Sequence, residues 1–203
     1  IDKSLSRAVD KGKLESADRD VVLDRLSFST DLAALADCDL VIEAIVEDIE
    51  AKNELFSTLD GLCGPEAIFA SNTSSLTITD MAAATSRPGR VVGLHFFNPV
   101  PVMKLVEVVR TIATRDDVFD TAFSFARNLG KQPIAAKDNS GFVVNLLLVP
   151  YMLDAIRHLD RGVASVEDID RAMTLGLGYP MGPFTLSDFV GIDTLCRISE
   201  IMF

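Results

Sequence analysis

The sequence is short of cysteine, of positive charge and of long hydrophobic runs, and it has no tryptophan. Its three cysteines, Cys38, Cys63 and Cys196, lie far apart and form no CxxC pair. Three thiols cannot all pair within one chain, so the pattern argues against a disulfide framework and favours a reducing compartment such as the cytoplasm. We therefore expect structural thiols and no metal site.

The scarcity of long apolar runs and of cations limits the partners. The longest apolar stretch, residues 142–153, is interrupted by Asn145 and Pro150 and is shorter than the ~18 residues of a membrane span. Lys+Arg number 19 and Asp+Glu number 30, which gives a net charge of −11. This balance argues against nucleic acid or a membrane as the partner. It does not argue against anionic small molecules, because a locally positive site can outweigh the net charge.

The remaining composition, 48% hydrophobic and 24% charged over 203 residues, is that of a globular protein with one or two domains. Apolar runs that predict strands alternate with amphipathic segments that predict helices, which indicates an open α/β sheet. The nearly continuous apolar run at 40–46 predicts a strand buried on both faces of a parallel sheet. The predicted strands are residues 40–46, 67–70, 91–97, 105–109 and 132–136.

The pattern changes after residue 138, because everything from Ser140 onward has helical periodicity. We therefore predict two domains, an α/β domain over residues 1–138 and an all-helical domain over residues 139–203. Two helix starts carry a capping-box pattern, in which a hydroxyl residue is followed three positions later by an acid. They are Thr77 with Asp80 and Ser165 with Asp168.

An α/β sheet prompts a search for a nucleotide-binding loop. The densest glycine cluster, Gly176 to Gly182, follows a predicted helix rather than a strand and contains Pro180. We reject it as a phosphate loop. The sequence has no P-loop, HExxH or GxSxG motif, and no dinucleotide fingerprint of its own.

Polar residues do follow the predicted strands. The run 71–75 (SNTSS) comes directly after one strand, where open α/β sheets bind ligands; a helix-capping turn would look the same. Glu47 follows the strand at 40–46 and faces the same crevice, whereas Glu43 within that run is interpreted as structural.

His95 stands near the end of one predicted strand and Glu107 in the otherwise apolar next strand. A buried carboxylate needs a partner. If the two strands are neighbours, Glu107 can orient the imidazole and leave its other nitrogen free as a general acid or base. The alternative is a satisfied core histidine beside a structural ion pair. Asn145 interrupts an apolar helix, and its amide serves either helix packing or a substrate contact.

Four segments, taken together in order and spacing, resemble the 3-hydroxyacyl-CoA dehydrogenase family, and most closely its single-function bacterial 3-hydroxybutyryl-CoA dehydrogenases. The resemblance covers essentially the whole chain, and the block from Gly93 to Glu107 is long and specific. The segments are SNTSS at 71–75, GLHFFNPVPVMKLVE at 93–107, NSGFVVN at 139–145 and GYPMGP at 178–183.

The resemblance implies an oxidoreductase that interconverts a short-chain L-3-hydroxyacyl-CoA and the 3-ketoacyl-CoA with NAD(H), in fatty acid β-oxidation or butanoate metabolism. NADP also stays open, because the acidic residue that would decide lies outside these residues. By the match, His95 is the general base, Glu107 is its orienting partner, and Ser74 and Asn145 bind the oxygen at C3. Asn98 helps to shape the substrate site.

The resemblance also assigns binding residues and an assembly. Ser4 and Lys11 would contact coenzyme A, where a cation suits the phosphates. The helical domain would form a homodimer and close over the substrate. The residues implied for the cofactor are Glu47, Lys52, Asn72 and Ser74.

Members of this family begin with a βαβ unit that carries a GxGxxG loop, and they continue with further helices. The chain starts at Ile1 within a helical pattern, so we expect a Rossmann-like sheet without that first unit and a shortened helical domain. Two alternatives remain. One is a non-catalytic relative that binds CoA esters or NAD without turnover, and the other is the dehydrogenase segment of a multifunctional β-oxidation protein.

Overall fold

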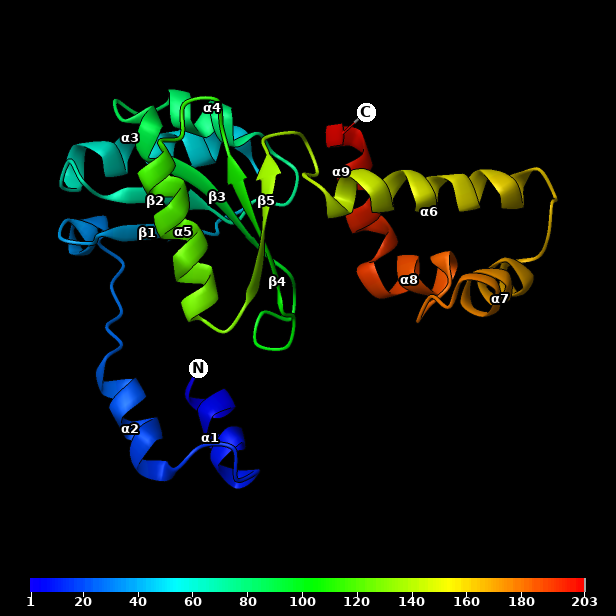
Figure 1. Cartoon of the computed structure of the whole chain (residues 1–203), viewed down its shortest axis with the longest axis horizontal. Coiled ribbons are helices and arrows are strands. Elements are labelled where there is room, and N and C mark those ends of the chain that lie inside the picture. The colour runs from blue at the N-terminus through cyan, green and yellow to red at the C-terminus, as the bar shows by residue number, and fades with distance from the viewer. Residues whose placement is uncertain (203) are drawn as a thin grey trace.

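The computed structural model describes residues 1–202, and its strands form one mixed sheet in the order β1-β2-β3-β4-β5. Neighbouring strands are parallel except β3 and β4, which are antiparallel. The α/β domain and the helical domain lie side by side, joined by the segment between β5 and α6 (Figure 1). The strands are β1 (Leu40–Glu43), β2 (Ile68–Ser71), β3 (Val91–Phe96), β4 (Leu105–Arg110) and β5 (Gln132–Lys137).

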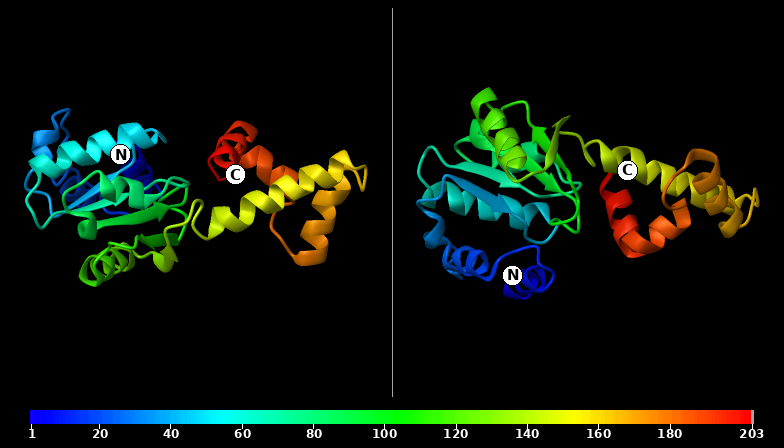
Figure 2. Two further views of the ribbon diagram at one scale, coloured as in Figure 1. Left: turned by 90° about the horizontal axis from the view of Figure 1, so that it is seen from above. Right: turned by 60° about the horizontal axis from the view of Figure 1, so that its bottom comes forward.

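Helices cover both faces of the sheet, because side chains alternate along the strands. On one face, α3 (Ile49–Leu62) and α4 (Ile78–Ala83) pack against residues such as Phe69 and Val91. On the other face, α5 (Asp116–Asn128) packs against their neighbours, such as Ala70 and Val92. The view from above shows α3 and α5 on opposite sides of the strands (Figure 2). The predicted α/β sheet is therefore confirmed.

The first strand is shorter and less buried than the sequence predicts. The run 40–46 was expected to be a strand buried on both faces, but β1 ends at Glu43 and Ile42 is 38% exposed. The prediction is wrong because the pairing of β1 with β2 ends at Glu43 and the contacts of α5 fall mainly on β3, β4 and β5. Residues 44–46 instead form a loop at the carboxyl edge of the sheet.

The two predicted capping boxes have different outcomes. Ser165 caps α7 (Val166–Leu177) as predicted, since its hydroxyl accepts the amide of Asp168 at 3.1 Å. Thr77 stands at the N-cap of α4, but its hydroxyl donates to the Asp80 carboxylate and accepts no helix amide, so the predicted capping bond is not formed. The carboxylate of Asp138 accepts the amides of Ile78 and Thr79 instead, at 2.9 and 2.6 Å. An acid from the segment between the domains therefore satisfies the start of α4.

The helical domain is built on α6 (Val144–Asp160), against which α8 (Pro183–Val190) and α9 (Ile192–Met202) pack. Val149, Met152 and Leu195 form its buried centre. Within residues 1–202, no helix combines the length and the apolar character needed to cross a membrane. At the start of the chain, α1 (Asp2–Asp10) packs against α2 (Ser16–Asp24) below the sheet in Figure 1. Short 3-10 turns are found at Leu32–Leu35 and Pro88–Arg90.

Candidate active site

The antiparallel pairing of β3 and β4 places His95 directly opposite Glu107. Their side chains meet with 2.7 Å between Nδ1 and Oε2, and the two residues are only 4% and 0% exposed. A carboxylate can only accept a hydrogen bond, so this contact assigns the proton to Nδ1. The other nitrogen, Nε2, is left with a lone pair that can take a proton.

Glu107 also connects the sheet to the helical domain. Its second oxygen, Oε1, accepts the amides of Val143 and Val144 at 3.1 and 3.0 Å, at the start of α6. Helix amides at that end carry partial positive charge, which suits a carboxylate. The buried charge of Glu107 is therefore satisfied on both sides, by His95 and by a helix N-terminus.

Two aromatic rings enclose the imidazole. Phe97 lies at 4.5 Å and Phe142 at 5.6 Å between ring centroids. Phe142 has a φ of +50°, a left-handed conformation that bulky residues rarely adopt. This backbone carries its ring onto His95 while the next two amides reach Glu107. The strained backbone at Phe142 thus positions both its own ring and the two amides that bind Glu107.

Ser74 and Asn145 join this pair from two different domains. The Ser74 hydroxyl lies 3.0 Å from Nε2 of His95 and can donate to it. The Asn145 amide of α6 donates to the Ser74 carbonyl at 3.2 Å. The structure thus brings His95, Glu107, Ser74 and Asn145 together, although it does not test their catalytic roles.

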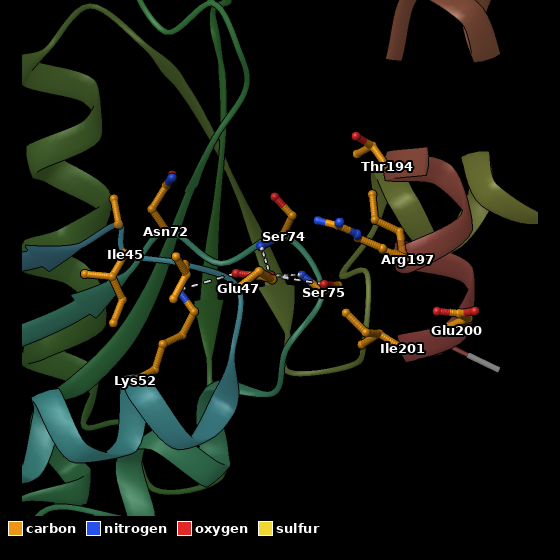
Figure 3. A pocket seen from close by; sticks show the side chains of 13 residues that line it. Ile45, Glu47, Lys52, Asn72, Ser74, Ser75, Thr194, Arg197, Glu200 and Ile201 are labelled. Carbon is orange, nitrogen blue, oxygen red and sulfur yellow. Dashed lines mark hydrogen bonds and ion pairs between the residues drawn. The ribbon is translucent and has the colours of Figure 1, made fainter. Parts of the chain in front are cut away.

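A cavity of about 760 Å³ adjoins these residues at the carboxyl ends of β1 and β2. The sheet side of the cavity combines polar residues with the apolar residues 44–46. The opposite wall is α9, with the Arg197 side chain pointing across toward Ser74 and Ser75 (Figure 3). Four residues expected from the resemblance to bind the cofactor line it, namely Glu47, Lys52, Asn72 and Ser74.

Glu47 is held in the cavity wall by several donors. Its Oε1 accepts the Thr73 hydroxyl, the Ser74 amide at 3.1 Å and the Ser75 hydroxyl at 3.0 Å, while Lys52 lies 3.3 Å from Oε2. Burial by itself would raise the pKa of Glu47, but these hydrogen bonds and the lysine charge outweigh it and lower the pKa. The carboxylate is therefore ionised at neutral pH.

The other expected residues have different surroundings. The Asn72 side chain accepts the Phe96 amide at 2.9 Å, which fixes the end of β2 to the end of β3. Asn98 is exposed just beyond β3. Ser4 belongs to α1 and Lys11 is its C-cap; neither lines the cavity, and α1 lies below the sheet in Figure 1. Their assignment to coenzyme A stays a prediction.

Sequence reasoning did not find the partner of Glu43 or single out Arg197. Glu43 was interpreted as structural, and its contact with Lys52, at 2.6 Å between Oε1 and Nζ, is consistent with that. Arg197 was not singled out, because nothing in a helical pattern marks the side chain that faces another domain. An acid inside an apolar strand was the available signal for Glu43, since a buried carboxylate needs a partner.

Open α/β sheets bind nucleotides at the carboxyl ends of their strands, and this sheet carries a buried histidine–carboxylate pair beside a polar cavity at that edge. These features suit the class of nucleotide-dependent enzymes that use proton transfer by a histidine. Two family models match the chain: the NAD binding domain of 3-hydroxyacyl-CoA dehydrogenase over residues 1–139, and the C-terminal domain of the same enzymes over residues 141–203. The chain belongs to the 3-hydroxyacyl-CoA dehydrogenase family.

Individual relatives agree with this assignment. A 3-hydroxybutyryl-CoA dehydrogenase from Mycobacterium tuberculosis is 54% identical over 205 aligned positions, which cover 100% of this chain and 72% of that protein. A 3-hydroxybutyryl-CoA dehydrogenase from Clostridioides difficile is 44% identical, with the same coverage of 100% and 72%. The crystal structure of (S)-3-hydroxybutyryl-CoA dehydrogenase from Ralstonia eutropha is 44% identical and superimposes with a TM-score of 0.95, covering 98% of this chain and 70% of that one.

Proposed function

We propose that this protein interconverts L-3-hydroxyacyl-CoA and 3-ketoacyl-CoA with NAD(H), and that short chains such as 3-hydroxybutyryl-CoA are its substrates. The observation that carries the proposal is the position of Nε2 of His95. This nitrogen is oriented from behind by Glu107, lies 3.0 Å from the Ser74 hydroxyl, and adjoins the cofactor cavity. The names of the relatives support the short-chain substrate.

In the oxidative direction, Nε2 of His95 takes the proton of the C3 hydroxyl, and the resulting imidazolium is stabilised by Glu107. Proton transfer by a positioned histidine contributes about 10²–10⁴-fold to a rate. In the reductive direction the same imidazolium returns the proton to the C3 oxygen. Ser74, which already occupies the hydrogen-bonding position on Nε2, and Asn145 beside it then bind that oxygen.

The residues around the cavity fit a nicotinamide dinucleotide. Glu47 offers carboxylate oxygens, Lys52 an ammonium, and Asn72 and Ser74 polar side chains, which are the groups that ribose hydroxyls and a carboxamide require. A nicotinamide bound there would supply the acceptor or donor of the hydride at C3. Glu47, Lys52, Asn72 and Ser74 would hold it.

We further propose a homodimer formed through the helical domain. Several of its large apolar side chains are exposed, including Leu147 at 70%, Leu175 at 80% and Phe189 at 73%. Apolar surface of this kind is typical of interaction sites. Light scattering coupled to gel filtration measures the mass in solution, and a monomer at micromolar concentration would contradict the dimer.

A cytoplasmic location stays a prediction from the three unpaired thiols.

The enzymatic proposal is tested by following NADH absorbance after addition of acetoacetyl-CoA. We expect NADH consumption by the wild type and its loss in His95→Gln, with CoA-ester binding retained. An undiminished rate in His95→Gln would refute the proposed base. His158→Gln is the matched control, since this second histidine is on an exposed face of α6 and bonds only the Asp154 carbonyl. Binding of the CoA ester without any hydride transfer in the wild type would favour a non-catalytic relative.

A further inference from the structure

Glu43 is a buried carboxylate that the proposed mechanism does not use. It is the last residue of β1, is 3% exposed and does not line the cavity. Its Oε1 accepts the Ile45 amide and the Lys52 ammonium, each at 2.6 Å, and its Oε2 accepts the Ser71 hydroxyl at 2.5 Å. A carboxylate with this many donors is held in one place.

Lys52 needs such a partner because its ammonium is buried. Its side chain is 1% exposed, although it forms part of the cavity wall. Of its two carboxylate contacts, Glu43 is the closer at 2.6 Å and has a side chain that is 0% exposed. Glu47 lies farther away at 3.3 Å and is 34% exposed, so water weakens its attraction for the lysine. Glu43 is therefore the principal anchor of Lys52.

The same carboxylate supports the loop that carries Ser74. The Ser71 hydroxyl donates to Glu43 and accepts the Thr73 amide at 3.2 Å, and the Thr73 hydroxyl in turn donates to Glu47. One network of hydrogen bonds thus runs from the end of β1 to the polar residues that face the cavity. Its only fully buried charged members are Glu43 and Lys52.

An ammonium has three hydrogen-bond donors, of which Lys52 gives one to Glu43, while Glu47 is an ion-pair partner 3.3 Å away. Two carboxylates around one ammonium leave the group with one net negative charge. This arrangement suits a ligand that presents neutral hydroxyl groups, which can donate to Glu47 and accept from Lys52. It disfavours a phosphate at the same position.

We propose that Glu43 is a positioning residue for the cofactor: it holds Lys52 in the orientation in which this lysine binds hydroxyl groups of the dinucleotide. The inference rests on the proposed function, because it takes NAD(H) as the occupant of the cavity. Glu43 does not line the cavity, so its effect on cofactor binding passes through Lys52, while its contact with Ser71 supports the neighbouring loop.

The test is a double-mutant cycle read by NADH binding, measured as the change in NADH fluorescence, alongside steady-state kinetics. We expect Glu43→Gln and Lys52→Met each to raise the Kd for NADH about 10–100-fold, the range of a hydrogen bond to a charged group. The double variant should have the Kd of Lys52→Met, since Glu43 then has nothing to position. For Glu43→Gln, the KM for NADH should rise with the Kd, while the KM for acetoacetyl-CoA stays within about threefold of the wild type.

Asp60→Asn is the matched control for a merely structural effect. Asp60 is on the same helix, α3, and pairs with Arg87 at 2.5 Å with both side chains 13% exposed, away from the cavity. We expect this variant to lose stability while its Kd for NADH is unchanged. A loss of fold reduces the active fraction and the amplitude of the titration, but it does not change the Kd of the molecules that remain folded.

The outcomes separate the two proposals. A wild type that does not bind NADH overturns the proposed function and this inference with it. A wild type that binds NADH while Glu43→Gln has an unchanged Kd overturns the inference alone. If Glu43→Gln does not fold, the double variant decides, because it removes the charged pair together. A Kd in the double variant well above that of Lys52→Met would show that Glu43 acts by another route.

Discussion

Replacing Glu107 by glutamine should invert the tautomer of His95. The two amides of α6, at 3.1 and 3.0 Å from Oε1, can only donate, so the glutamine carbonyl must turn toward them. The opposite orientation would leave buried amides facing an NH₂ group, at about 1–3 kcal/mol for each unsatisfied donor. The NH₂ group then faces Nδ1, which must become an acceptor, and the proton moves to Nε2.

A histidine that is protonated on Nε2 cannot accept the proton of the substrate hydroxyl. In the serine protease triad the equivalent acid-to-amide change lowers kcat about 10⁴-fold, and we expect a fall of about 10³–10⁴-fold here. That corresponds to about 4–5.5 kcal/mol of transition-state stabilisation. The KM for L-3-hydroxybutyryl-CoA should change little, because the residues that contact the CoA ester are untouched. The assay is NADH formation from NAD at saturating L-3-hydroxybutyryl-CoA, the direction in which His95 must accept a proton, combined with thermal unfolding.

Asp170→Asn is the control for the loss of a helix-capping carboxylate. Asp170 accepts the amides of Phe184 and Thr185 at 2.8 and 2.9 Å at the start of α8, distant from the imidazole in sequence and outside the cavity wall. It should lose stability and keep its kcat. A Glu107→Gln variant with a kcat within about tenfold of the wild type would refute the tautomer argument.

Three further predictions concern pH, packing and thiol reactivity. Because hydrogen bonds and a neighbouring ammonium outweigh burial and lower the pKa of Glu47, its contribution to stability should be present above about pH 4.3 and disappear as the pH falls through the lowered value. Urea unfolding should show a flatter acid dependence in Glu47→Gln, and an identical slope would contradict this. Gly93→Ala should destabilise by about 1–3 kcal/mol, since the new Cβ would lie 2.7 Å from Cβ of Val109; equal urea midpoints would show that the strands can separate. Burial raises the pKa of Cys63, so a chromogenic disulfide reagent should modify the exposed Cys196 well before Cys63, and equal rates would be the contrary result.

Much of this site could be predicted from local pattern. The carboxylate at 107 within an apolar run indicated a buried partner, and strand adjacency made His95 the candidate. The polar run after β2 indicated the edge of the sheet that binds ligands, because the carboxyl ends of parallel strands meet at that edge. These inferences needed only the spacing of neighbouring elements.

The contacts between the domains could not be predicted in that way. Asn145 and Ser74 are 71 positions apart, and the contact of Glu107 with Val143 spans 36 positions. No periodicity within one element indicates which residue of another domain will face it. The capping bond of α4 was mispredicted for the same reason, because the distant acid Asp138, and not the adjacent hydroxyl, accepts the first helix amides. The length of β1 was mispredicted because its pairing with β2 ends at Glu43, and an apolar run does not indicate where such pairing ends.

The direct opposition of His95 and Glu107 across the β3–β4 pair has a consequence for how the site can evolve. Side chains in a strand alternate between faces, so a slip of one residue in this pairing would send both groups to new surroundings at once. Lengthening or shortening the connection at residues 97–104 is therefore neutral only when it leaves the register intact. Substitutions in that connection are tolerated more readily than insertions or deletions, and the catalytic alignment is inherited as a single unit.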